Sequence, residues 1–271
     1  MARSVWLVEL IKKAFPGRFL LARMTGVPII GRAIEHLLFR GDDLMYLPKT
    51  RMIQVNKPVD RPGEIVLPSR VVEHFIEKAN YHWIMDFCIC RDAMQCEDYP
   101  IDMGCLFLGE AALGINPQIG RSVSREEALE HVQRCRDAGL VHMVGRNKLD
   151  SVWLGVSPSN KLLTICNCCP CCCLWRVLPH IAPRIGDKVT RMPGVTVTVK
   201  DQCVGCGTCT ENVCFADAIR LYNGRAVIGD ACRGCGRCVE VCPEGAIELS
   251  LDGWDSVDES IRRVSRLVDV T

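Results

Sequence analysis

Long apolar runs, a strong charge of either sign and the common nucleotide-binding motifs are all missing from this sequence of 271 residues. Its longest apolar patch, at residues 5–11, is interrupted by Glu9 and falls far short of the roughly 20 apolar residues that a spanning helix needs. The formal net charge is +1, and no basic face interleaved with aromatic residues suggests nucleic acid. No G-x-G-x-x-G sequence, Walker motif or catalytic triad is present, so a flavin or nicotinamide would have to belong to another chain. We also find no export signal, and we expect a cytoplasmic protein.

Cysteine is present in large excess, with 19 in the chain. In a secreted protein this number would indicate disulfides, but here the cysteines stand in the spacings of metal ligands. A C-x₂-C-x₂-C sequence occurs twice near the C-terminus, and one more cysteine follows each copy. The first copy contains Cys203, Cys206, Cys209 and Cys214, and the second contains Cys232, Cys235, Cys238 and Cys242.

This repeat resembles the bacterial-type ferredoxins that carry two [4Fe–4S] clusters, over roughly 50 residues. The resemblance rests on the paired C-x₂-C-x₂-C loops, the glycines between their cysteines, and Pro243 directly after the last cysteine. Phe215 stands where proline is usual in the first copy, and the one extra residue before Cys214 predicts a local bulge. The resemblance implies that each cluster takes its fourth ligand from the other copy. The implied ligand sets are Cys203, Cys206, Cys209 and Cys242 for one cluster, and Cys232, Cys235, Cys238 and Cys214 for the other. A structural zinc site is the alternative interpretation of these spacings.

Ten further thiols are clustered between residues 88 and 173. They are Cys88, Cys90, Cys96, Cys105, Cys166, Cys168, Cys169, Cys171, Cys172 and Cys173. Alternate side chains of an extended segment share a face, so we expect the run 166–173 to divide its thiols between two directions. Cys166 and Cys168 would point one way, and Cys169, Cys171 and Cys173 the other. Four thiols from each group would suffice for two further [4Fe–4S] clusters. One extra cluster, a zinc site, and burial as small apolar side chains are the alternatives.

The segment around these thiols resembles a cysteine-rich module found before ferredoxin domains in many uncharacterised iron–sulfur proteins of anaerobes. The matching sequences are Cys88-Ile-Cys90-Arg91, Gly139-Leu-Val-His142 and Ile165-Cys166-Asn-Cys168-Cys169. The resemblance covers roughly residues 70–250 and implies anaerobic metabolism without a specific activity. Arg91 is expected either to offset cluster charge or to lie at the surface. Among the histidines, only His82 and His142 lie on predicted strands near the cysteines.

The sequence predicts an α+β protein with a ferredoxin-like two-cluster domain at the C-terminus. Residues 1–54 are predicted to form a helical docking arm, 55–68 a proline-rich linker, 69–194 a cysteine-rich mixed α/β domain, 195–250 the ferredoxin-like domain and 251–271 a C-terminal helix. Within the cysteine-rich domain we expect a helix from Ser69, a strand at 81–85, and a helix that starts with a capping box at Ser124 and buries Cys135. Residues 141–144 and 151–154 are expected to pair as a hairpin.

These patterns predict an iron–sulfur electron-transfer subunit that relays low-potential electrons between a donor and a partner redox enzyme, such as a flavoprotein. One alternative is an enzyme in which a special cluster within residues 88–173 binds and reduces a thiol, a disulfide or another small molecule. Another is a non-redox scaffold. The basic and apolar first 50 residues are predicted to dock on a partner protein, with a membrane surface and the chain's own domain as alternative contacts.

Overall fold

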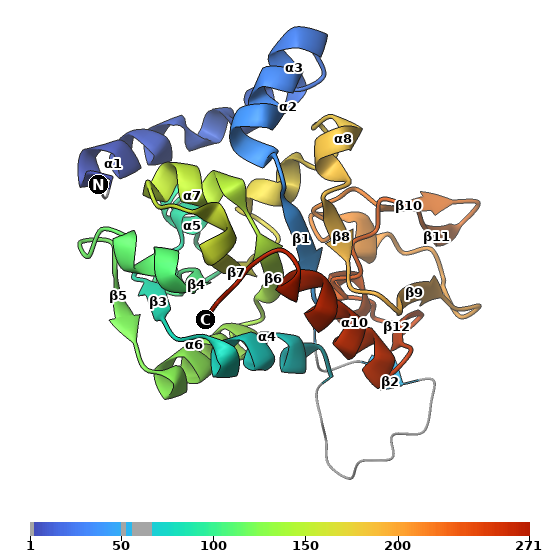
Figure 1. Ribbon diagram of the computed structural model, residues 1–271. Coiled ribbons are helices and arrows are strands. Elements are labelled where there is room, and N and C mark those ends of the chain that lie inside the picture. Colours follow the sequence, from blue (N-terminus) through green and yellow to red (C-terminus); the bar gives the residue numbers. More distant parts are fainter. Residues whose placement is uncertain (1–2, 50–52, 56–66) are drawn as a thin grey trace.

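A seven-stranded mixed sheet forms the centre of the protein in the computed structural model, which describes residues 3–49, 53–55 and 67–271 (Figure 1). Its strand order is β5-β3-β4-β7-β6-β1-β8, and all neighbours are antiparallel except β1 and β8. The strands are β1 Asp43–Tyr46, β3 His82–Met85, β4 Leu106–Leu108, β5 Gly120–Val123, β6 Val141–Arg146, β7 Leu163–Cys168 and β8 Val189–Arg191. The middle strand, β7, carries two of the clustered cysteines.

Helices cover both faces of this sheet (Figure 1). On one face lie α4 Leu67–Lys78, α6 Arg125–Asp137 and α10 Trp254–Ser265. The other face is covered by α1 Val5–Ala14, α2 Arg18–Met24, α5 Ile89–Ala93 and α7 Lys148–Leu154, while α3 Pro28–Ile34 and α8 Pro183–Gly186 flank it. Strand alternation separates the two sides, because Met45 packs with α4 whereas Leu44 and Tyr46 pack on the opposite side. The mixed architecture is compatible with the predicted α+β class.

Three of the predicted elements are confirmed. The helix expected from Ser69 is α4, and the strand expected at 81–85 is β3. The capping box is formed as predicted, with the backbone N–H of Glu127 donating to Ser124 Oγ at 3.2 Å, and Cys135 is fully buried on α6. The elements are present because each rests on a local signal, either apolar periodicity or a cap, although α4 begins at Leu67, which places Ser69 inside the helix, and β3 begins at His82.

The predicted hairpin is wrong, because residues 148–154 form the helix α7 instead of a strand. Asp42 accepts a hydrogen bond from the backbone N–H of Lys148 at 2.7 Å and so caps the start of this helix from a distant part of the chain. Gly155 ends the helix in the left-handed conformation, with φ +71°. A long-range cap of this kind leaves no signal in the local sequence.

The C-terminal repeat folds beside the large sheet and contains two smaller sheets. One has the order β2-β12-β9, formed by Ile53–Val55, Ile247–Leu251 and Val195–Val199. The other is the hairpin of β10 Ile219–Tyr222 and β11 Arg225–Ile228. Asn223 and Gly224 both have positive φ, as a two-residue type I′ turn requires. The short helix α9 Arg237–Glu240 lies within the second cysteine loop.

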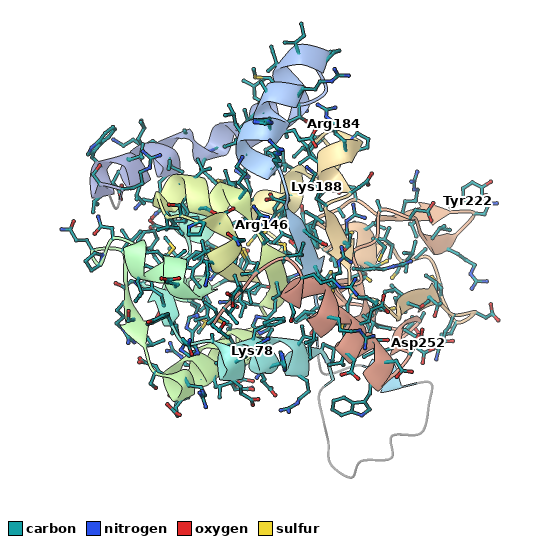
Figure 2. The ribbon with its side chains drawn as sticks, viewed as in Figure 1. Lys78, Arg146, Arg184, Lys188, Tyr222 and Asp252 are labelled. Atoms are coloured by element: carbon teal, nitrogen blue, oxygen red, sulfur yellow. The ribbon has the colours of Figure 1, made fainter. Side chains whose placement is uncertain are left out.

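The first 50 residues are not the separate docking arm that the sequence predicted. The breaks at Pro16 and Pro28 do divide them into short helices, but Val8 is buried against the large sheet, and β1 is one of its strands. Arg184 and Lys188, labelled in Figure 2, each form an ion pair with Glu35 at 2.9 Å and tie the N-terminal helices to the core. β2 in turn pairs with β12 of the C-terminal repeat. Within the predicted linker, residues 56–66 lie outside the described part of the chain.

None of the helices in the described residues is both long enough and apolar enough to cross a bilayer.

Candidate metal centres

The eight cysteines of the C-terminal repeat lie around two small cavities. One is lined by Cys203, Cys206, Cys209 and Cys242, which we call set 1. The other is lined by Cys214, Cys232, Cys235 and Cys238, which we call set 2. Each cavity therefore receives three thiols from one loop and the fourth from the other half of the repeat. The structure brings together the members of each predicted set, and metal ligation itself stays a prediction.

Backbone N–H groups point at the sulfurs of both sets. The N–H of Ala218 donates to Cys214 Sγ at 3.3 Å, and the equivalent N–H of Ala246 donates to Cys242 Sγ at 3.2 Å. Further N–H donors reach Cys203 and Cys232 at 3.4 Å. Such bonds favour the thiolate form of a ligand and stabilise the more negative, reduced state of an iron–sulfur cluster.

The loop glycines make this close approach of the backbone feasible. Gly205 has φ +70°, and a Cβ at this position would lie 2.1 Å from the carbonyl oxygen of Gly224. Any other residue would therefore push the set 1 loop away from the β10–β11 turn.

Burial opposes ionisation of three thiols of set 2. It raises the pKa of Cys235 to about 11 and also raises the pKa values of Cys232 and Cys238 above their usual range. A thiol in such surroundings becomes a thiolate when a cation compensates its charge. These three residues thus suit a group that carries its own positive metal ions.

The ten thiols of residues 88–173 form two adjacent groups that share Cys169. Seven of them line a cavity of about 440 Å³ between the large sheet and the N-terminal helices, which we call the chamber. These seven are Cys88, Cys90, Cys105, Cys166, Cys168, Cys169 and Cys173. The rest of the lining is largely apolar and includes Phe15, which directly follows α1, Trp153 of α7 and Trp175.

Four thiols, including the shared Cys169, form a compact group. Cys96, Cys169, Cys171 and Cys172 have all their sulfurs within 4.8 Å of one another. The Sγ–Sγ distances are 3.5 Å from Cys96 to Cys171 and 3.6 Å from Cys171 to Cys172. We call these residues the four-thiol group.

This grouping of the thiols, in which Cys169 belongs to both groups, differs from the expected one. Cys166 and Cys168 share one direction as predicted, since they lie two residues apart on β7, but Cys173 returns to their side. The chain turns at residues 170–172, and Cys173 begins the short helix Leu174–Val177, so strand alternation no longer applies there. Cys96 separates from Cys88, Cys90 and Cys105 because it follows the end of α5, where Gln95 has a positive φ of 47°.

Arg91 lies fully buried near both thiol groups, which excludes the surface position considered from the sequence. Nε and Nη1 donate at 2.7 Å to the carbonyl oxygens of Pro100 and Asn167, and Nη2 donates to that of Met103. These acceptors are neutral, so the balancing negative charge has to come from elsewhere. Burial alone would lower the pKa of Arg91, but Cys88, Cys169 and other nearby thiols raise it above the ordinary arginine value.

Two further residues, Tyr46 and Arg237, connect set 2 with the chamber, and neither was predicted from the sequence. The hydroxyl group of Tyr46 lies 3.8 Å from Cys168 Sγ and 3.7 Å from Cys173 Sγ. Its ring packs on Phe215, with centroids 4.6 Å apart, and Phe215 directly follows Cys214 of set 2. Arg237, inside the second cysteine loop, donates to the carbonyl oxygen of Cys168. The only signal in the sequence was Phe215 in place of the usual proline.

The two histidines that were singled out have protein partners. His82 Nε2 lies 2.7 Å from the carbonyl oxygen of Ile76, and His142 Nδ1 lies 2.8 Å from the amide oxygen of Asn167. Burial lowers the pKa of His142 to about 4, so the imidazole is neutral near pH 7. Neither His82 nor His142 is therefore needed as a ligand in the cysteine sets predicted from the sequence.

Comparison with known families supports part of this description. Residues 210–251 match the family model described as the LdpA Fe-S cluster-binding domain. The comparisons with curated proteins and with solved structures found no match. The matched residues begin just after Cys209 and include all of set 2, together with Cys242 of set 1. The chain therefore contains an iron–sulfur cluster-binding domain.

Proposed function

We propose that this chain is an iron–sulfur electron-transfer protein that relays low-potential electrons between a donor and a partner redox enzyme. Set 1, set 2 and the chamber are the proposed redox centres, with a [4Fe–4S] cluster in each of the two sets. When bound, such clusters accept and release one electron at a time. The observation that carries the proposal is the continuous contact from set 2 through Phe215 and Tyr46 to the chamber thiols.

The residues of this path are buried and packed together. Tyr46 and Phe215 belong to one apolar core with Cys168 and Cys173, and Cys214 packs against the same core. A path through packed side chains excludes water, so little solvent would have to reorganise when the charge moves. Tyr46 also donates its O–H to Cys168 Sγ, which favours the negatively charged form of that thiol.

Set 1 lies at the surface and suits exchange with a partner. Cys206 is exposed, and so are Val204, at 65%, and Tyr222, at 67%. Tyr222 projects outward from the β10–β11 hairpin in Figure 2. Exposed apolar residues beside a redox centre are suited to a transient contact that brings a partner close. We propose that a redox subunit, such as a flavoprotein, docks here.

The N-terminal helices offer a second surface. Their inner side covers the chamber, while Trp6, Leu20 and Ile29 are exposed on the outside. We propose that this outer face contacts a second partner protein, and binding to anionic vesicles instead would identify it as a membrane contact.

The proposal is tested on the full chain purified without oxygen. Iron and sulfide should each exceed eight atoms per chain, with about eight for sets 1 and 2 and the remainder for a cluster in the chamber. Cys214→Ser should remove about four iron atoms, whereas Cys135→Ser, the control at a buried cysteine outside the sets, should leave the count unchanged. Tyr46→Leu should keep the iron but slow electron exchange between set 2 and the chamber, while Tyr222→Leu should not. A chain that lacks sulfide, or equal rates in the two tyrosine variants, would contradict the proposal.

A second candidate function follows from the size of the chamber. Its volume of about 440 Å³ lies within the range of small-ligand sites, and its walls are largely apolar, as is usual for such sites. The chamber would then be the place where a small thiol or disulfide is reduced. Addition of such compounds should change the electron paramagnetic resonance signal in the wild-type chain, and an unchanged signal would leave electron relay as the function.

A further inference from the structure

The four-thiol group differs in kind from the other thiol centres. We propose that Cys96, Cys169, Cys171 and Cys172 bind a single zinc ion in a closed, structural site. This inference is independent of electron transfer, because zinc has no redox chemistry in proteins.

The spacing of the sulfurs favours a single ion. A zinc ion with Zn–S bonds of about 2.3 Å in tetrahedral geometry places its sulfurs about 3.8 Å apart. The observed distances of 3.5 Å and 3.6 Å, with all four sulfurs within 4.8 Å, are close to this value. A four-iron cluster spreads its thiolates over four metal atoms and therefore needs a wider arrangement.

Set 1, set 2 and the chamber provide an internal comparison. Within the ranges 3–49, 53–55 and 67–271, the four-thiol group is the group of metal-ligating side chains whose ligand atoms lie close enough together to hold a single ion. The sulfurs of sets 1 and 2, which occupy the positions implied by the ferredoxin resemblance, surround cavities and are not all this close to one another. The same chain thus contains two types of thiol arrangement.

The surroundings suit a closed tetrathiolate site. Two of the four residues, Cys169 and Cys172, are buried, and the backbone N–H of Cys172 donates to Cys169 Sγ at 3.3 Å. Four thiolates around a divalent cation carry a net charge of about −2, and the buried guanidinium of Arg91 lies on this side of the chamber. Cys135 and Leu140 pack against the two buried thiols, while Cys96 and Cys171 are partly exposed.

The position of the site indicates its role. Cys96 follows α5, while the other three residues belong to the loop after β7, so a bound ion would join two segments that are distant in sequence. The loop is flanked by Cys168 and Cys173, which line the chamber. A zinc ion at the four-thiol group would therefore hold the chamber wall in place.

The decisive experiment measures zinc in the full chain, produced with both iron and zinc in the medium and kept under anaerobic conditions. We expect one zinc per chain, and X-ray absorption at the zinc edge should show four sulfur neighbours at about 2.3 Å. A zinc content below one ion for every five chains would overturn the proposal, and so would nitrogen and oxygen neighbours of the zinc. Both measurements use the wild-type chain, so neither depends on the folding of a variant.

Variants then assign the site. Cys171→Ser should lower the zinc content severalfold while iron and sulfide stay at the wild-type level. Cys135→Ser, which removes a thiol from the same apolar cluster, should keep the zinc. If Cys171→Ser instead removes about four iron and four sulfide atoms, the site holds a cluster and the proposal is wrong, while the electron-transfer function is unaffected.

Discussion

At the scale of single residues, burial changes the chemistry of side chains that look ordinary in the sequence. Arg91 carries a full positive charge where no water reaches it, and such a charge costs several kcal/mol unless negative charge lies close by. The ionised thiols of the chamber and the four-thiol group can provide that charge. Thiolates bound to a metal there would stabilise Arg91 and be stabilised by it. The neighbouring Cys90 made Arg91 noticeable in the sequence, but its burial depends on the carbonyl group of Pro100 and on that of Asn167, which lies far along the chain.

Asp42 should make the stability of the protein depend on pH near neutrality. Burial and, to a smaller extent, the nearby Asp150 raise the pKa of Asp42 from an ordinary value of 3.8 to about 7, against the opposing effects of the hydrogen bond from the Lys148 N–H and the charges of Lys188 and Arg146. The folded protein thus holds the proton more tightly than the unfolded chain, and this contribution to stability is lost as the pH rises through about 7.

We expect the free energy of unfolding to be on the order of 1 kcal/mol higher at pH 6 than at pH 8. Asp42→Asn keeps an oxygen that can accept from Lys148 and should remove much of this difference. Anaerobic urea unfolding at the two pH values measures both. An equal pH dependence in wild type and variant would show that Asp42 is not the group responsible.

At the scale of elements, the alternation of side chains along β7 decides on which face of the sheet its thiols lie. Leu163 and Ile165 face α4 and α6, so Cys166 and Cys168 must face the N-terminal helices, and those helices cover them. The strand alternation and the capping box were predictable because neighbouring residues determine them. The cover over the chamber was not, because it depends on contacts between α1 and α5 such as the Lys12–Asp92 ion pair, at 2.6 Å.

The role of α1 as a cover can be separated from a role as a free arm by two substitutions on the same helix. Val8 is 1% exposed and Leu10 is 52% exposed. Val8→Ala leaves a cavity against the large sheet and should lower the free energy of unfolding by about 2 kcal/mol. Leu10→Ala should change it by less than about 0.5 kcal/mol. Similar changes in the free energy of unfolding for the two variants would instead support the detached arm that the sequence predicted.

At the scale of the whole molecule, one apolar core joins the two parts that the sequence analysis treated as separate domains. Leu249 and Leu251 of β12 belong to the same core as Phe75 of α4 and Ile165 of β7. The ferredoxin-like repeat was recognisable in the sequence because its ligand spacing is local. Its attachment to the large sheet was not, because the joining residues are ordinary apolar side chains spread over the chain.

A shared core predicts that the large sheet and the C-terminal repeat unfold together. Leu249→Ala, which removes a buried side chain from β12, should lower the stability of the whole chain by about 3 kcal/mol. Far-ultraviolet circular dichroism, which reports the helices, and visible absorbance, which reports the iron–sulfur centres, should shift together in anaerobic urea unfolding. Val227→Ala, at an exposed position of β11, is the control. Separate transitions for the two signals would instead indicate two independent domains.

The pairing of β2 with β12 also bears on how the protein is made. Ile53 lies opposite Leu249, so an early strand finds its neighbour only when nearly all of the chain has left the ribosome. During that interval the ten thiols of residues 88–173 have already emerged, while the strand that completes the smaller sheet has not. Thiols in an unfinished chain are open to oxidation and to the wrong metal. A reducing environment during synthesis would therefore protect these thiols until the chain is complete.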